Sequence, residues 1–248
     1  ASDPLAAESK LSIKKRMAEH SRKGMWLKAY GGSGEKDPIK DIGVNGYDYD
    51  FQGTTIGFDL ETSKIKQAIA LSVQTGSVTS NNKEGYQDYE TVLLNYQSTR
   101  ALKHGGSLAL SAGFGVSEID AKRYIDVGAV DDTATADYRS YSVDLGIAYT
   151  FSPIRLGWLT NDLTLSLAGN YNAQESYKEK GAGGLNLEVA PKHTMVGRVG
   201  IENTMFIEDT SDKGAKFMPF LSTGIFGSRH LTNTAVKQGF IGAEQVKV

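Results

Sequence analysis

The chain has 248 residues, a formal net charge of −2 and no cysteine. This charge balance excludes the global basic field of a typical nucleic-acid-binding protein, so we expect no nucleic-acid partner. The absence of thiols excludes disulfide frameworks and cysteine metal sites, while 28 glycines, 5 prolines and 12 tyrosines favour a β-rich protein with tight turns.

Residues 1–23 are predicted to form a separate basic helix. Asp3 is a suitable N-cap, Pro4 suits the first helical position, and Gly24 can end the helix. Six basic and three acidic side chains give the segment a charge of about +3. The basic residues are Lys10, Lys14, Lys15, Arg16, Arg22 and Lys23. Two placements stay open, a solvated leader or a linker helix inside a water-filled, acidic barrel lumen.

From Gly24 onward the chain predicts one strand after another. In the clearest stretch, 141–151, large apolar residues alternate with small or polar ones. Successive side chains of a strand point to opposite faces, so this pattern gives one apolar and one small, polar face. Ten strands are predicted, at 25–34, 48–61, 65–76, 88–100, 106–117, 138–151, 163–173, 194–206, 216–226 and, cut short by the chain end, from about 240.

The same alternation suits a soluble sandwich or a membrane barrel. No apolar run of about eighteen residues exists to form a membrane-spanning helix, and a barrel would leave none. Small and polar side chains can line a wet lumen while apolar ones face lipid. The lipid-facing candidates are Leu108, Leu110, Val143, Leu145, Ile147, Leu165 and Leu167. The lumen-facing candidates are Lys28, Asp59, Asp144, Arg198 and Glu202.

The predicted connections alternate in length. Short links are expected at 61–64, 101–105, 152–162 and 209–214. Long polar links are expected at 35–47, 77–88, 118–137, 172–193 and 228–239. Outer-membrane barrels have short periplasmic turns and longer external loops, whereas a Greek-key sandwich need not keep this order. The pattern therefore predicts an all-β, antiparallel, up-and-down transmembrane β-barrel whose first strand rises from the periplasm.

Five stretches follow the polar helix: GMWLKAYGG (24–32), YDFQGTTIGFD (49–59), YETVLLNY (89–96), GSLALSAGFG (106–115) and SYSVDLGIAYTF (140–151). In this order they resemble the autotransporter β-domain, the translocator of type V secretion. The resemblance implies a twelve-stranded barrel with an α-helix in its pore. It also implies an N-terminal passenger exported to the bacterial surface, and a location in the outer membrane.

Two features depart from the resembled family. We count ten strands, and the chain ends in Val248 where such domains end on an aromatic residue read by the outer-membrane barrel-assembly machinery. We therefore expect 24–248 to be a β-barrel translocator domain truncated at its C-terminus. The start at Ala1, with neither Met nor a signal peptide, indicates a processed or excised piece.

The sequence predicts no cofactor, no metal site and no enzymatic activity. The histidines lack a metal-binding spacing and are His20, His104, His193 and His230. The inward charged residues could form the catalytic pair of an outer-membrane protease, or a structural network lining the pore.

The predicted function is an outer-membrane translocator that anchors and exports a passenger. Its expected partners are outer-membrane lipid, the N-terminal passenger and the barrel-assembly machinery. An outer-membrane adhesin or porin acting through its own long loops is the alternative, and a soluble β-rich binding domain is the third candidate.

Overall fold

A computed structural model describes most of the chain after residue 23. The described residues are 24–38, 46–61, 65–81, 84–103, 105–128, 130–156, 159–207, 220–232, 237–241 and 246–247. The predicted helix at 1–23, with all six of its basic residues, lies outside them. No helix among the described residues is long and apolar enough to cross a membrane.

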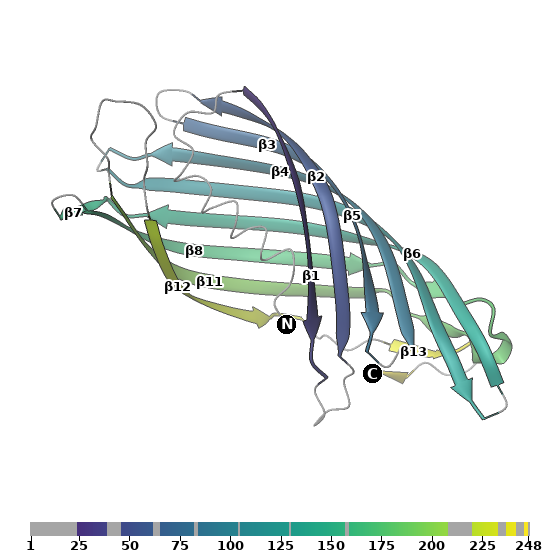
Figure 1. Ribbon diagram of the computed structural model, residues 1–248. Coiled ribbons are helices and arrows are strands. Elements are labelled where there is room, and N and C mark those ends of the chain that lie inside the picture. Colours follow the sequence, from purple (N-terminus) through teal and green to yellow (C-terminus); the bar gives the residue numbers. More distant parts are fainter. Residues whose placement is uncertain are drawn as a thin grey trace.

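One large antiparallel sheet makes up most of the structure (Figure 1). Its long strands are β1 (Gly24–Lys36), β2 (Tyr47–Glu61), β3 (Ile65–Ser80), β4 (Gly85–Ala101), β5 (Ser107–Val127), β6 (Val130–Thr150), β8 (Leu159–Gln174), β11 (Lys192–Ile207) and β12 (Phe220–His230). The strands lie side by side in that order, and the short β7 (Ile154–Leu156) pairs with β8. Each long strand thus pairs with the long strands before and after it in the chain, which is the predicted up-and-down topology.

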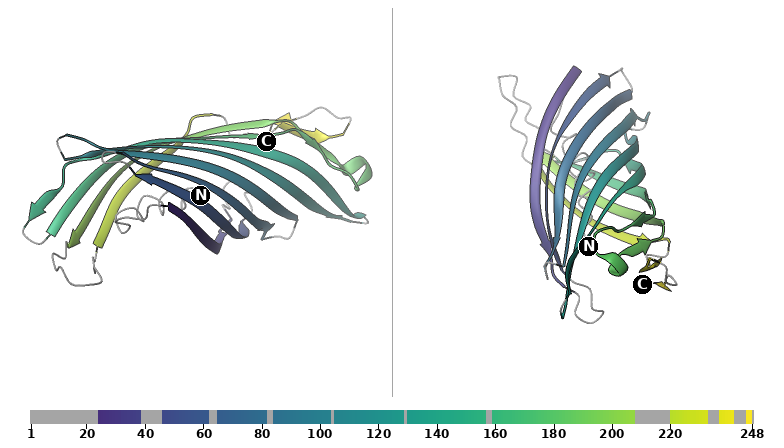
Figure 2. Two further views of the ribbon diagram at one scale, coloured as in Figure 1. Left: turned by 90° about the horizontal axis from the view of Figure 1, so that it is seen from above. Right: turned by 90° about the vertical axis from the view of Figure 1, so that its right-hand side faces the viewer.

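The sheet is strongly curled, with a concave and a convex face (Figure 2). Within the described residues, β1 pairs with β2 alone and β12 with β11 alone, so the sheet is open between β1 and β12. The prediction of a tenth barrel strand from about residue 240 was wrong. The strand there, β13 (Lys237–Phe240), pairs with β10 (Leu187–Val189) and β14 (Val246–Lys247).

A small second sheet lies at the end of the large one where β5 and β6 meet (Figure 1). Its strand order is β14-β13-β10-β9, with β9 at Tyr177–Lys178 and the 3-10 turn η2 (Gly183–Leu185) between β9 and β10. The segments that follow β8 and β12 are therefore joined by backbone hydrogen bonds, which the sequence did not predict.

Much of two predicted loops is strand. Residues 77–80 and 85–87 extend β3 and β4 beyond the predicted ends, and residues 118–127 and 130–137 extend β5 and β6, which reach 21 residues each. Pairing in the longer hairpin runs to Val127 and Val130. In the added stretches of this hairpin, charged residues occupy the outward positions that are apolar in the rest of each strand. The alternation with a period of two continues, but the polar composition made the stretches resemble loops.

Candidate functional site

The concave face, called the inner face below, consists of alternate positions with small or polar side chains. Hydroxyl groups form hydrogen bonds directly across neighbouring strands: Thr55 with Ser72 at 2.7 Å, Thr91 with Ser117 at 2.8 Å, and Thr150 with Thr164 at 2.9 Å. Thr55, Ser72 and Thr91 are buried although they face no apolar core. These pairs satisfy hydroxyl groups that a curled sheet brings together.

The five predicted lumen-facing residues occupy inner-face positions and are partly exposed. Asp59 accepts a hydrogen bond from Trp26 Nε1 at 3.0 Å, and Asp144 accepts one from Asn170 Nδ2 at 2.8 Å. The Lys28 ammonium lies 5.2 Å from the centre of the Tyr30 ring, and Glu202 accepts a hydrogen bond from Ser222. For Asp59, Asp144 and Glu202 these contacts are with an adjacent strand, and for Lys28 with its own strand. Arg198 also has an interaction partner.

Four aromatic rings follow one another along the inner face of β1 and β2. The ring centres of Tyr30 and Phe51 lie 6.4 Å apart, those of Phe51 and Tyr49 6.5 Å, and those of Tyr49 and Tyr47 6.4 Å. We call Tyr30, Phe51, Tyr49 and Tyr47 the aromatic ladder. The first three lie over glycines of the neighbouring strand, where a Cβ atom would come within 2.5–3.0 Å of the ring; these are Gly53, Gly32 and Gly34.

The convex face exposes large apolar side chains. Leu145 is 61% exposed and Leu167 56%. Leu110, Val143, Ile147 and Leu165 are also exposed, and Leu108 is partly exposed. A water-soluble protein rarely exposes so continuous an apolar surface. The predicted lipid contact of these seven residues stays a prediction.

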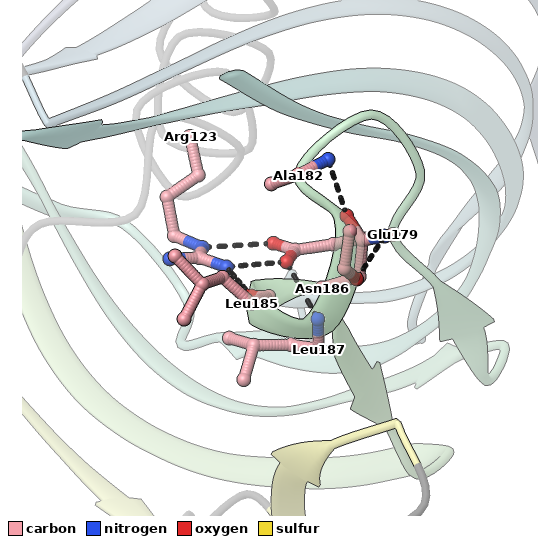
Figure 3. A network of polar contacts seen from close by, with 7 residues as sticks. Arg123, Glu179, Ala182, Leu185, Asn186 and Leu187 are labelled. Carbon is pink, nitrogen blue, oxygen red and sulfur yellow. Dashed lines mark hydrogen bonds and ion pairs between the residues drawn. The ribbon is translucent and has the colours of Figure 1, made fainter. Parts of the chain in front are cut away.

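Arg123 and Glu179 join the β5–β6 hairpin to the segment between β8 and β11 (Figure 3). Arg123 Nε donates to Glu179 Oε1 at 3.0 Å, and Arg123 Nη2 donates to Glu179 Oε2 at 2.6 Å and to the Leu185 carbonyl at 2.8 Å. The Leu187 amide donates to Glu179 Oε2 at 2.8 Å. The Arg123 side chain is 32% exposed and that of Glu179 only 8%, so this is a two-pronged ion pair largely shielded from water.

Apolar and aromatic contacts reinforce this junction. Ile125 and Ala134 of the hairpin pack against Ala182, with Leu185 beside them. The rings of Tyr138 and Tyr177 stack with their centres 4.4 Å apart and an interplanar angle of 11°. We call the ion pair, the apolar cluster and the ring stack together the clasp.

The ring stack predicts that the clasp loosens in alkali. The pKa of Tyr138 is raised mainly by burial, and to a smaller degree by the charge of Tyr177. The pKa of Tyr177 is also raised mainly by burial, and to a smaller degree by the charge of Glu179. A pKa raised on folding contributes stability that is complete below the unfolded value of 10.0 and is lost as the pH rises through the folded value. We therefore expect residues 177–189 to become accessible to protease only above pH 10. Tyr138→Phe should shift this release to still higher pH, and release below pH 10 would contradict the expectation.

A row of carboxylates crosses the convex face beyond the apolar residues. Asp88, Asp120 and Asp137 are direct partners across β4, β5 and β6. A hydrogen bond with Asp137, followed by slight burial and by neighbouring carboxylates, raises the pKa of Asp120. In the next row Arg139 Nη2 lies 2.6 Å from Glu118 Oε1. Like charges directly opposite one another on neighbouring strands destabilise a sheet, so these three carboxylates lower the stability of this part of the hairpin.

The fold, with its apolar convex face and polar inner face, is that of the wall of an outer-membrane barrel. A comparison of the sequence with known families shows to which family of such barrels the chain belongs. Residues 25–247 match the autotransporter beta-domain family. The chain belongs to the autotransporter β-domain family. It is an outer-membrane translocator domain that exports a passenger, as predicted, and its all-β antiparallel barrel fold is confirmed.

Solved structures agree with the family in fold. The translocator domain of the autotransporter NalP from Neisseria meningitidis matches with a TM-score of 0.61 and 14% identity, over 94% of this chain and 89% of that chain. The β-domain of the Bordetella autotransporter BrkA matches with a TM-score of 0.58 and 13% identity, over 88% of this chain and 86% of that one. No curated protein matches the chain in sequence.

Sequence reasoning missed the clasp of this autotransporter domain. Arg123 and Glu179 are 56 residues apart and lie in stretches predicted as loops, so no local spacing connects them. The glycine-backed aromatic ladder was detectable in part, because every second residue within 49–53 and within 30–34 is aromatic or glycine. Among the described residues, no group of three or more histidine, aspartate or glutamate side chains could hold a metal ion.

Proposed function

We propose that the passenger crosses the outer membrane in extended form along the inner face, with the aromatic ladder as its contact surface. The observation that carries this proposal is the even ring spacing of 6.4–6.5 Å. Side chains on one side of an extended polypeptide repeat every two residues, about 6.6–6.8 Å. Alternate side chains of a passing chain can therefore meet successive rings without a preferred sequence.

The rest of the inner face suits passage of varied sequences. It is lined by small side chains such as Ala70, Ser111, Gly113 and Ala148, which offer no pockets for a particular side chain. Aromatic surfaces bind apolar and cationic groups alike, through burial and cation–π attraction. A ladder on one wall and a smooth surface elsewhere favours sliding over tight binding.

The basic segment at 1–23 completes the proposed path. Its charge of about +3 complements the inner carboxylates Asp59, Asp144 and Glu202, which supports placing it in the lumen after export. Each such attraction across a wet pore is weak, about 0.2–1 kcal/mol, so only the sum holds the segment there.

The convex face supports two further partners. Outer-membrane lipid would cover the exposed leucines and valines, and the barrel-assembly machinery would insert the strands into that lipid. We also propose that the domain acts without catalysis, because the hydroxyl, carboxamide and carboxylate groups described above bond to their neighbours on adjacent strands.

Cysteine cross-linking tests the path, because the chain has no cysteine of its own. A passenger with a single cysteine is fused ahead of Ala1 and stalled during export by a tightly folded, ligand-bound domain. We expect it to form a disulfide with Lys28→Cys on the inner face. The matched control is Leu27→Cys, one residue away on the convex face and 73% exposed. Cross-linking at Leu27→Cys, or at neither position, would refute the path.

A further inference from the structure

We infer that residues 177–189 form a lid over the external mouth of the translocator, and that Arg123 is the positioning residue that latches it shut. The inference rests on the proposed path, because the lid regulates that path where it leaves the membrane. The segment is called the lid below.

The lid covers the inner face of the hairpin. Arg123 and Ile125 of β5, with Ala134, Ala136 and Tyr138 of β6, continue the inner-face positions of both strands. These side chains contact or lie beneath the lid, whereas the convex-face residues Glu118 and Asp120 are exposed. Figure 2 shows η2, the green turn, beside the end of the β5–β6 hairpin. A passenger leaving along the inner face therefore meets the lid.

The lid lies at the external rim. A membrane strand needs about 9–11 residues, so roughly half of each 21-residue strand of the hairpin extends beyond the bilayer. Such barrels have their longer excursions on the external side. The β5–β6 hairpin and the connection between β8 and β11 extend far at this rim, whereas only residues 62–64 separate β2 from β3 at the other.

Few contacts hold the lid on the hairpin, and they bury little apolar surface. The apolar cluster consists of Ile125 and two alanines with Leu185 alongside. Two backbone hydrogen bonds join Thr135 and Lys180, at 2.8 and 2.9 Å. Segments with little buried apolar surface are those that open locally while the rest of the protein stays folded. Beside these contacts and the ring stack of Tyr138 with Tyr177, the shielded ion pair is the charged contact between the lid and the hairpin among the described residues.

Two glycines give the lid its path. Gly181 and Gly183 have φ angles of 104° and 54°, which other residues rarely adopt. A Cβ atom on Gly181 would lie 2.5 Å from the Thr133 carbonyl oxygen of the hairpin. The close approach that lets Glu179 reach Arg123 therefore depends on a residue without a side chain.

The lid also links distant parts of the wall. Its strand β10 pairs with β13, and the Ile241 amide donates to the Asn186 carbonyl at 3.0 Å. The connection after β8 and the one after β12 thus form one body, anchored to the hairpin through the clasp. Releasing Arg123 frees that body from the hairpin on the passenger's side.

The test measures entry of a fluorescent solute through the outer membrane of cells that carry the domain with its passenger. Lys14, Lys15 and Arg16 are changed to Glu throughout, so that the inner carboxylates no longer hold the basic segment at 1–23 in the lumen. Arg123→Gln leaves the shielded Glu179 carboxylate without its cation, which raises the equilibrium constant for opening roughly tenfold to a hundredfold. We expect solute entry to increase severalfold. The matched control Arg139→Gln breaks an exposed pair of the same length on the convex face, with side chains 57% and 64% exposed, and should change nothing.

A reversible lock separates a latch from a merely structural contact. Thr135 and Lys180 are hydrogen-bonded partners in an isolated antiparallel bridge. The Cα atoms of such a pair lie about 5.5 Å apart, within disulfide range. Thr135→Cys with Lys180→Cys in the Arg123→Gln background should restore the normal barrier when oxidised and lose it again when reduced. Arg123→Lys, which keeps the charge but not the fork, should give a smaller increase if Arg123→Gln fails to assemble.

Unchanged solute entry in an assembled Arg123 variant would overturn the latch, and so would entry that the oxidised lock does not reverse. Heat-modifiable migration on a gel shows whether each variant has assembled. The cross-link at Lys28→Cys is independent of these readouts. If that cross-link forms while solute entry stays constant, the lid is wrong and the path stands; if the cross-link fails, the path is wrong whatever the lid does.

Discussion

Replacing Leu167 with arginine is expected to destabilise the domain by about 2–4 kcal/mol, the cost of a cation near the middle of the lipid-facing band. Leu167 is 56% exposed on the convex face, between Ile147 and Val199 of the neighbouring strands. No water reaches that surface in a membrane, so the guanidinium must distort the bilayer or leave its solvation unsatisfied.

Ala168→Arg is the matched control, because Ala168 is the next residue and is exposed on the inner face. An arginine there enters a wet, polar surface, and we expect a change within about 0.5 kcal/mol. Reversible urea unfolding in lipid vesicles measures both values. Equal costs at the two positions would show that the assigned faces are wrong.

The Gly57→Ala variant is expected to lose about 1–3 kcal/mol of stability through overpacking. An added Cβ atom would lie 2.2 Å from Cζ2 of the Trp26 ring, which covers Gly57 from the neighbouring strand. The ring cannot retreat without breaking its hydrogen bond to Asp59.

Gly169→Ala is the control for this prediction, because a Cβ atom there would meet no atom of the described residues within 4 Å. The double variant Trp26→Leu with Gly57→Ala should recover part of the loss by removing the clash. Thermal unfolding in detergent measures all three. A Gly57→Ala variant as stable as Gly169→Ala would show that Trp26 can move aside at little cost.

The sequence predicted the wall of the barrel well and its external end poorly. Around 141–151, large apolar and small residues alternate without interruption, because one face of the strand is apolar and exposed and the other is small and polar. That contrast is what a single sequence displays best, and β6 contains Leu145 and Ile147 on the expected convex face.

Past the apolar band both faces of the hairpin carry polar side chains or pack against the lid, so the contrast disappears. Glu118, Asp120 and Lys122 take the outward positions, and the strand was read as a polar loop. The clasp could not be predicted for another reason. Arg123 and Glu179 meet only because two connections fold against one hairpin, and that depends on tertiary packing rather than on local pattern. The segment around Phe240 misled for the same reason, since its partner is β10 and not β1.

The length of the β5–β6 hairpin also implies a tall projection beyond the membrane. A strand of 21 residues is about 70 Å long, or about 50 Å along the membrane normal at a tilt near 40°. With an apolar band about 25 Å tall, the hairpin rises about 25 Å above the lipid, roughly the height of a small folded domain. With the hairpin end outside, as inferred above, the cell surface carries an acidic projection of the translocator itself, with Gly128 at its tip, whichever passenger is displayed.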